Sequence, residues 1–368
     1  MIVMTTASHA VALAKTPARS LPLEYWPEAD RTAWKAACQP AKRLKPGGAA
    51  GHLKPVTRDD HARHYGDFLG FLERDGLLQI DGPPGANVIA EKVDAYLAEL
   101  KGRVASTTVH GSICKVRRLA QYIAPPGTDF TWLLEIGKEL ALVMRPRPKF
   151  DRLVLTEVLV EAGLTLIQEA EQSPEMTKLA RAHQIRNGLM VALLALCPIR
   201  RKNFATLEIG RSFLKIKGRW WIVLSVSETK EGRSDERPVP ELLTPVIDRY
   251  LEQHRPVLAR SHNPASALWL SQNSGMAISD KEVARVIRNA TLSTVGVKLG
   301  PHMFRTCAAS AAAVYGGANP YLGSAVLHHA DPRATIQHYN RATSLSAAES
   351  FRQIVRQCEK VTDEFTSK

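Results

Sequence analysis

The sequence has few cysteines and no long apolar run. Its 368 residues include five cysteines, and none belongs to a Cys-x-x-Cys pair: Cys38, Cys114, Cys197, Cys307 and Cys358. This odd, scattered set fits free thiols in a reducing compartment. The longest apolar run, residues 188–199, is too short to span a bilayer and leads into arginines. No charged leader precedes the first apolar residues, so we expect a soluble, intracellular protein without a signal peptide.

Acidic residues are scarce relative to basic ones. The chain has 36 Asp and Glu against 49 Lys and Arg, which gives a net charge of +13 and a pI near 9.6. This charge predicts a polyanionic partner, most simply nucleic acid. An anionic membrane surface or a ribosome would satisfy the same charge, so charge alone does not decide.

Composition and spacing divide the chain into four parts. Residues 1–55 carry eight Lys and Arg against three Asp and Glu, which predicts a basic N-terminal arm with one short ordered element at residues 27–38. Helical apolar spacing then predicts a small all-helical domain over residues 56–142. In residues 143–153, prolines alternate with positive charges, which predicts a stiff linker.

The remaining part, residues 154–368, predicts a second domain that is mostly helical. Long helical patterns cover residues 151–172 and 178–197. Residues 212–243 are β-branched and aromatic, with turn signals at Lys217-Gly218 and Glu231-Gly232, so they predict a short antiparallel sheet. Helical patterns resume after it. The expected fold class is mainly α with a small antiparallel β-sheet (α+β).

The last helix of the first domain, residues 106–123, carries three cations away from its apolar stripe. They are Lys115, Arg117 and Arg118, and Thr107 or Thr108 is the expected helix cap. A solvated face is the ordinary explanation for such a trio. Together with the basic arm, the trio favours contact with phosphate.

Two places in the second domain put basic residues where packing does not require them. Arg200 and Arg201 directly follow an apolar helix, where a guanidinium needs an anionic partner, either a ligand or a nearby carboxylate. Pro301 suits a helix start, and His302 and Arg305 share one face of the first turn. A helix N-terminus with these two side chains suits a phosphate; a capping histidine and a surface arginine are the alternative.

A third place is the stretch LHHADPRATIQHYN, residues 327–340. Asp331-Pro332 has the form of an N-cap followed by proline at the first helical position, so His329 lies just before a helix. Tyr339 then falls two turns into that helix. A core tyrosine and a histidine metal site are the alternatives, but no His-x-x-x-His or Cys-x-x-Cys pair offers a strong chelate.

Cationic donors that converge on one phosphate beside a tyrosine suit phosphoryl transfer from a DNA backbone. Fixed donors stabilise the negative transition state, each by roughly a hundredfold in rate. With a pKa near 10, a tyrosine is only ~0.1% phenolate at neutral pH. It therefore needs nearby cations or a base to act as a nucleophile.

The order R…K…HxxR…H…Y resembles the catalytic domain of the tyrosine recombinases, the phage-integrase family. In the family's arginine box, RRKNFATL matches with Arg200 as the arginine, because Leu207 is then seven residues on. The family's lysine lies on a β-hairpin turn, where Lys230 stands, with Arg233 and Arg237 as alternatives.

The rest of the set follows from the same resemblance, which covers roughly residues 56–350. The HxxR box gives His302 and Arg305, the histidine of the family's LGH is His329, and the tyrosine is Tyr339. The domain at residues 56–142 is similar to the family's core-binding domain. Two positions depart from the family: Asn203 replaces the usual carboxylate, and His328 replaces the glycine of LGH.

The resemblance implies site-specific recombination. Tyr339 attacks the scissile phosphate of duplex DNA to form a 3′-phosphotyrosyl bond, with neither ATP nor metal. Arg200 and Arg305 hold the non-bridging oxygens, and Lys230 protonates the leaving 5′-oxygen. His302 assists proton transfer from the tyrosine, and His329 bonds the phosphate or orients its neighbours.

The resemblance also implies partners and a place of action. The partner is double-stranded DNA, bound by a homotetramer on paired sites. Accessory DNA-bending proteins are possible further partners, and no membrane partner is expected. The protein then acts in the cytoplasm, associated with the nucleoid. The amphipathic tail, residues 346–365, is expected to dock on a neighbouring protomer or on its own domain. A type IB topoisomerase and a catalytically silent DNA-binding protein on the same fold are the rival functions.

Overall fold

The chain folds into two compact units. The structure is a computed structural model that describes residues 19–146, 150–230, 232–259, 266–271, 273–315 and 321–328. The units are Met1–Arg147 and Pro148–Lys368, and each is described by itself. None of the described helices is both long and apolar enough to cross a membrane.

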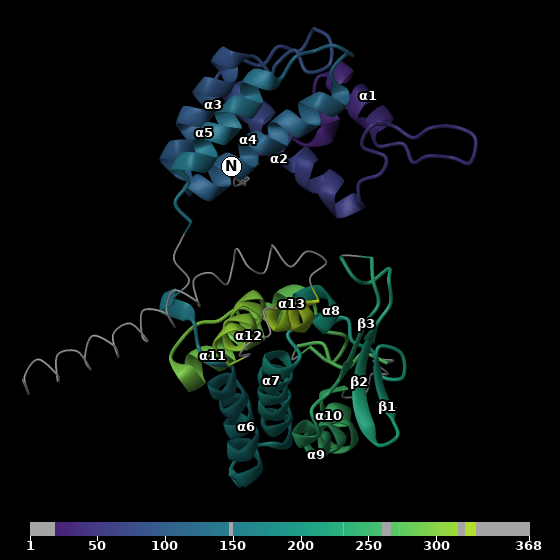
Figure 1. Cartoon of the computed structure of the whole chain (residues 1–368), viewed down its shortest axis with the longest axis vertical. Coiled ribbons are helices and arrows are strands. Elements are labelled where there is room, and N and C mark those ends of the chain that lie inside the picture. Colours follow the sequence, from purple (N-terminus) through teal and green to yellow (C-terminus); the bar gives the residue numbers. More distant parts are fainter. Residues whose placement is uncertain are drawn as a thin grey trace, which may run out of the picture. The chain divides into compact units, whose positions relative to one another are not determined.

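The N-terminal unit is a bundle of helices (Figure 1). After a 3₁₀ turn, Leu23–Tyr25, come α1 (Glu28–Ala37), α2 (Pro55–Arg74), α3 (Ala90–Arg103), α4 (Ser106–Ile123) and α5 (Thr131–Val143). The apolar stripe of α4 recurs every three or four residues and is buried along its whole length, as helical periodicity requires. Because α4 begins at Ser106 after Ala105, neither Thr107 nor Thr108 is the cap that the sequence predicted.

Residues 19–55 belong to this folded unit, in contrast to the extended arm predicted from their composition. Trp26 and Trp34 are buried in the same core as the helices. Asp30 is 1% exposed and accepts hydrogen bonds from the Tyr65 hydroxyl (2.8 Å) and the Gly85 backbone N–H (2.7 Å). Burial, partly offset by these bonds, raises the pKa of the Asp30 carboxyl. Burial of these aromatic side chains therefore folds the segment into the unit, although the segment is rich in basic residues.

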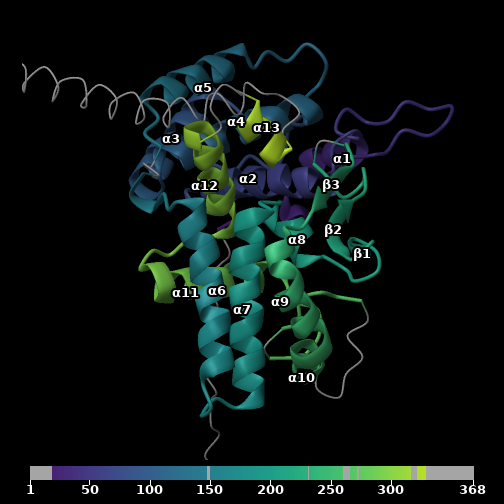
Figure 2. The same cartoon turned by 60° about the horizontal axis from the view of Figure 1, so that its bottom comes forward.

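The second unit is built on two long helices, α6 (Thr156–Gln172) and α7 (Lys178–Leu196), which lie side by side in both views (Figure 1 and Figure 2). They approach closely because each presents a glycine: a Cβ at Gly163 would lie 2.7 Å from the Ala192 nitrogen, and one at Gly188 would lie 2.5 Å from the Gly163 oxygen. The buried face of α7 forms the centre of the core.

Shorter elements surround this pair. They are the 3₁₀ turns Phe150–Arg152 and Glu241–Leu243, α8 (Arg201–Ala205), α9 (Thr244–Arg249), a π-helical turn (Tyr250–His254), α10 (Arg255–Ala259), α11 (Asp280–Val295), α12 (Pro301–Tyr315) and α13 (Leu322–Leu327). The helix predicted to begin at Pro301 is thus confirmed.

The predicted sheet is present and has three antiparallel strands in the order β1-β2-β3: β1 (Phe213–Ile216), β2 (Arg219–Leu224) and β3 (Asp235–Pro238). Lys217 and Gly218 form the two-residue turn between β1 and β2, both with positive φ (48° and 81°). Leu224 pairs with Asp235, so residues 225–234 form the loop between β2 and β3. The fold class, mainly α with a small antiparallel sheet, is confirmed.

Candidate active site

Arg305 lies in the first turn of α12 and joins three distant segments. Its side chain is buried, and the residue is 7% exposed. Nη1 donates to the Pro198 carbonyl at 2.6 Å, and Nη2 donates to the Leu327 carbonyl at 2.8 Å. Pro198 belongs to the connection between α7 and α8, and Leu327 is the last residue of α13. Two carbonyls fix the plane of the guanidinium, so Arg305 has a defined orientation.

Arg200 is placed next to this anchor by the chain path. It is the N-cap residue of α8, two residues after Pro198, and it is half-buried. Arg201 is exposed instead and forms an ion pair with Asp280 (2.8 Å) at the start of α11. Phe204 and Leu207 are buried and hold α8 against the core. Arg200 and Arg201 are therefore both close along the chain to the Pro198 carbonyl that Arg305 contacts, and the assignment of Arg200 as the family's arginine stays a prediction.

The side chains of His302 and Lys230 are exposed, and each residue is next to a buried one in the sequence. His302 is on the first turn of α12, beside the buried Met303. Lys230 is in the β2–β3 loop, directly after Thr229, which is 2% exposed. The Thr229 hydroxyl donates to the Arg233 carbonyl (2.7 Å) and accepts from the Arg233 backbone N–H (3.1 Å). The threonine therefore closes the loop and leaves the lysine at its surface.

A second arginine ties β3 to α13. Arg237 donates from Nε and Nη2 to the two oxygens of Asp235 (2.8 and 2.9 Å) and from Nη1 to the Val326 carbonyl (2.6 Å). The side chains of Arg237 and Asp235 are 13% and 11% exposed. We call this arrangement the β3 clamp. Its geometry engages the Arg237 side chain in contacts within the second unit.

His328 keeps the backbone conformation that glycine favours. It caps α13 with φ 50° and ψ 48°, in the left-handed region. Histidine enters this region more readily than most residues. Its Nδ1 lies 3.8 Å from an Asp235 oxygen of the β3 clamp. The departure from the LGH pattern therefore leaves a left-handed turn in place. The other departure, Asn203, is buried in α8.

The remaining members of the predicted set lie outside the described residues. These are His329, Tyr339 and the tail at residues 346–365. Within the described ranges, the structure brings the segments of Arg200, Arg305 and the end of α13 together through hydrogen bonds to Arg305. In the same ranges, no group of three His, Cys, Asp or Glu side chains could hold a metal ion.

The cation trio of α4 is partly engaged within the N-terminal unit. Lys115 Nζ lies 2.6 Å from an Asp60 carboxylate oxygen and 3.1 Å from His64 Nε2. Arg117 contacts Gln121 (3.4 Å), and Arg118 is exposed. Burial, together with the positive charges of Lys115 and Arg63, lowers the pKa of His64 to about 4. The trio thus presents one exposed cation, Arg118, beside one that Asp60 already neutralises.

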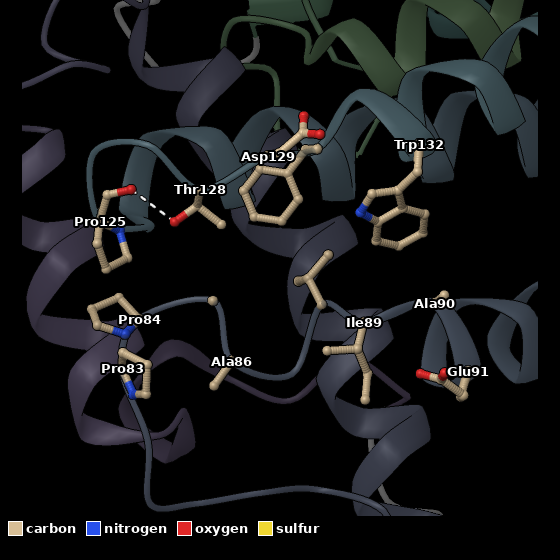
Figure 3. A pocket seen from close by; sticks show the side chains of 13 residues that line it. Pro83, Pro84, Ala86, Ile89, Ala90, Glu91, Pro125, Thr128, Asp129 and Trp132 are labelled. Carbon is tan, nitrogen blue, oxygen red and sulfur yellow. Dashed lines mark hydrogen bonds between the residues drawn. The ribbon is translucent and has the colours of Figure 1, made fainter.

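The N-terminal unit also contains an apolar cavity of about 520 Å³. Pro83, Pro84 and Ile89 face the start of α5 across it, where Asp129 and Trp132 lie (Figure 3). The Thr128 hydroxyl is bonded to the Pro125 carbonyl at its rim. No cluster of cations lines this cavity, so it does not suit a phosphate.

Comparisons with known proteins identify the fold. No family model matches the sequence, and no curated protein matches it. A structure of XerH site-specific recombinase bound to difH substrate, a pre-cleavage complex, matches with a TM-score of 0.54 over 80% of this chain and 79% of that one, at 15% identity. The post-cleavage complex of XerH with a palindromic difH substrate matches with a TM-score of 0.57 over 91% and 99%, at 14% identity. The chain has the tyrosine recombinase fold.

Within this tyrosine recombinase fold, sequence reasoning missed the β3 clamp. The sequence signal for this clamp is a two-residue spacing. Asp235 and Arg237 are two residues apart in a strand, so their side chains project from the same face of the sheet. That spacing predicts an ion pair once the segment is assigned to a strand. It gives no hint that the arginine also reaches Val326, which is 89 residues away in the sequence.

Proposed function

We propose that this protein is a tyrosine site-specific recombinase that cleaves and rejoins duplex DNA through a 3′-phosphotyrosyl intermediate. The observation that carries the proposal is the buried Arg305, whose two backbone anchors join the Arg200 segment to the end of α13. This convergence occurs on a fold shared with a recombinase that is solved on DNA. The net charge of +13 supports a polyanionic partner.

The proposed reaction is a transesterification at phosphorus. The Tyr339 hydroxyl attacks the scissile phosphate, so a bond forms between phosphorus and the phenolic oxygen while the bond to the 5′-oxygen breaks. His302 assists removal of the phenolic proton, and Lys230 gives a proton to the leaving 5′-oxygen. A 5′-hydroxyl of the partner duplex then attacks the phosphotyrosine and releases the phenol. One ester replaces another at each step, so the reaction needs no ATP and no metal.

The cations have separate tasks in this scheme. The pentacovalent transition state carries more negative charge than the phosphodiester, and fixed donors stabilise it, each by roughly a hundredfold in rate. Arg305 is preorganised by the Pro198 and Leu327 carbonyls. Arg200 binds a second non-bridging oxygen, and His329 bonds the phosphate. Lys230, exposed on its loop, is free of the packing that immobilises Arg237.

The proposed assembly follows from the reaction. Exchange between two duplexes needs two cuts in each, so four protomers act around a pair of sites. The tail at residues 346–365 docks on a neighbouring protomer or on its own domain in this assembly, and accessory DNA-bending proteins can join it. The core-binding role falls to the helices of the N-terminal unit, with Arg117 and Arg118 of α4 on the phosphates and Lys115, paired with Asp60, beside them. In the cell, the protein acts on the nucleoid.

Covalent capture tests the proposal and identifies the target site in the same experiment. Purified protein is incubated with a library of nicked duplexes, so that cleavage releases a short strand and traps the enzyme. Denaturation then removes all DNA except that bound covalently. We expect the wild type to retain DNA that sequencing resolves to one site, and Tyr339→Phe to retain none. Equal retention by the two proteins, or none by either across the library, contradicts the proposal.

The same captured site separates recombination from relaxation. Two differently labelled duplexes that carry the site are mixed with the protein, and joined products that carry both labels are measured. We expect exchanged products. Relaxation of a supercoiled plasmid without exchange would identify a type IB topoisomerase instead.

A further inference from the structure

A short turn projects from the N-terminal unit between α1 and α2. Lys42 and Lys45 exchange two backbone hydrogen bonds, each 3.0 Å long, which place Arg43 and Leu44 at the tip. All residues from 41 to 46 are exposed, and Leu44 is 93% exposed. Figure 1 shows this loop reaching away from the helices. We call residues 41–46 the basic turn.

The base of the basic turn is firmly built. The Gly48 backbone N–H donates to the Gln39 carbonyl (2.9 Å), and a Cβ at Gly48 would collide with the Ala36 oxygen. Arg58 of α2 donates to three backbone carbonyls below the turn, those of Cys38 (2.9 Å), Gly51 (2.6 Å) and Leu53 (2.9 Å). The half-buried guanidinium of Arg58 thus binds the chain both before and after the loop. It holds the two ends of the loop together, so the tip has a fixed direction.

The charge of the turn is not neutralised by its surroundings. The 28 residues from Arg31 to Arg58 contain seven Lys and Arg and no Asp or Glu. Among the described residues, the side chains of Lys42, Arg43 and Lys45 have no hydrogen-bond or ion-pair partner. An exposed turn of three cations repels itself, and this cost is recovered when an anion binds.

Leu44 separates this turn from an ordinary solvated loop. Turn tips favour Gly, Asn, Asp and Ser, because glycine tolerates the turn dihedrals and the polar side chains form hydrogen bonds with the turn backbone and with water. Leu44 is 93% exposed between two cations and offers neither property. Proteins that bind the minor groove of DNA frequently combine these two chemistries, with Arg and Lys at the groove and an apolar side chain inserted between base steps.

We propose that the basic turn is a DNA-contact element: Lys42, Arg43 and Lys45 bind phosphates of the duplex, and the Leu44 side chain packs into the groove between them. The inference rests on the proposed function, because it takes duplex DNA as the partner. It adds a second contact surface to the unit, carried by a loop and separate from the α4 cations.

The salt dependence of binding tests the phosphate contacts. Affinity for a fluorescent mixed-sequence duplex is measured by anisotropy over a series of salt concentrations. Each phosphate contact contributes about 0.9 to the slope of log K against log salt, so the triple variant Lys42→Ala/Arg43→Ala/Lys45→Ala is expected to lower the slope by roughly 2 to 3. A matched variant removes the same charge from the exposed lysines at positions 101, 178 and 217 and is expected to keep the wild-type slope.

Leu44→Ser tests the groove contact. It removes no charge, so we expect affinity about tenfold weaker at an unchanged salt slope, because apolar surface is no longer buried. An unchanged slope in the triple variant, or an equal fall in the matched variant, overturns the phosphate contacts. Unchanged affinity in Leu44→Ser overturns the groove contact. A wild type that binds duplex but forms no covalent complex refutes the recombinase proposal and leaves the basic turn standing, so the two failures are distinct.

Discussion

Loss of Arg237 should destabilise the second unit by about 3 kcal/mol. Arg237→Gln removes two hydrogen bonds to Asp235 and one to Val326, and it leaves a carboxylate that is 11% exposed without its cation. Removal of one partner from a buried ion pair typically costs about 3 to 5 kcal/mol, most of it from the charge left behind. The residual exposure of the β3 clamp places the expected value at the lower end of that range.

The contribution of the unpaired Asp235 charge to this loss of stability can be separated from the contribution of the lost contacts. In the double variant Asp235→Asn/Arg237→Gln no charge is left unpaired, so we expect it to be more stable than Arg237→Gln alone. Arg249→Gln is the control, because its ion pair with Glu171 is exposed (42% and 37%) and should contribute about 1 kcal/mol or less. Urea unfolding of the full chain measures these three variants and the single variant Asp235→Asn, which completes the cycle. A cost for Arg237→Gln as small as that of the control, or single costs that simply add in the double variant, would refute the reasoning.

Three further predictions concern single side chains. Lys230→Met should slow cleavage by roughly a hundredfold or more, and a substrate with sulfur at the 5′-bridging position, which needs no proton to leave, should restore the rate of covalent capture. Asp60→Asn releases Lys115 from its ion pair and should steepen the salt slope of DNA binding by about 0.9, measured by anisotropy. The pKa of His64 is about 4 in the folded unit and near 6.5 when unfolded, so the unfolded chain binds the proton more tightly and stability falls as the pH drops through this window. Between pH 7 and pH 5 the expected loss is about 2 kcal/mol, and it should be absent in His64→Asn on urea unfolding.

Local patterns predicted most of the elements because their causes are local. The apolar stripe of α4, the Lys217-Gly218 turn and the proline that begins α12 each depend on neighbours within one or two turns of chain. The choice of Arg200 over Arg201 also came from spacing, and it stays a prediction.

Other features depend on the tertiary structure and left no local signal. The composition of residues 1–55 indicated an arm. Residues 1–18 lie outside the described residues, but in residues 19–55 two buried tryptophans, Trp26 and Trp34, pack into the core that α2 and α4 form, despite the surrounding charge. Arg305 was predicted as a phosphate ligand from its helix position. Its own anchors are backbone carbonyls 107 and 22 residues away, which no sequence spacing reveals.

Because Arg305 is anchored by main-chain oxygens, its orientation depends on the course of the polypeptide and not on which amino acids stand at positions 198 and 327. Every residue type, proline included, supplies a carbonyl. Mutations can therefore accumulate around this guanidinium without deleting either acceptor, provided that the turns they occupy persist. An arginine anchored by main-chain carbonyls therefore tolerates many substitutions around it. This agrees with the fold that the chain shares with the XerH structures at 14–15% sequence identity.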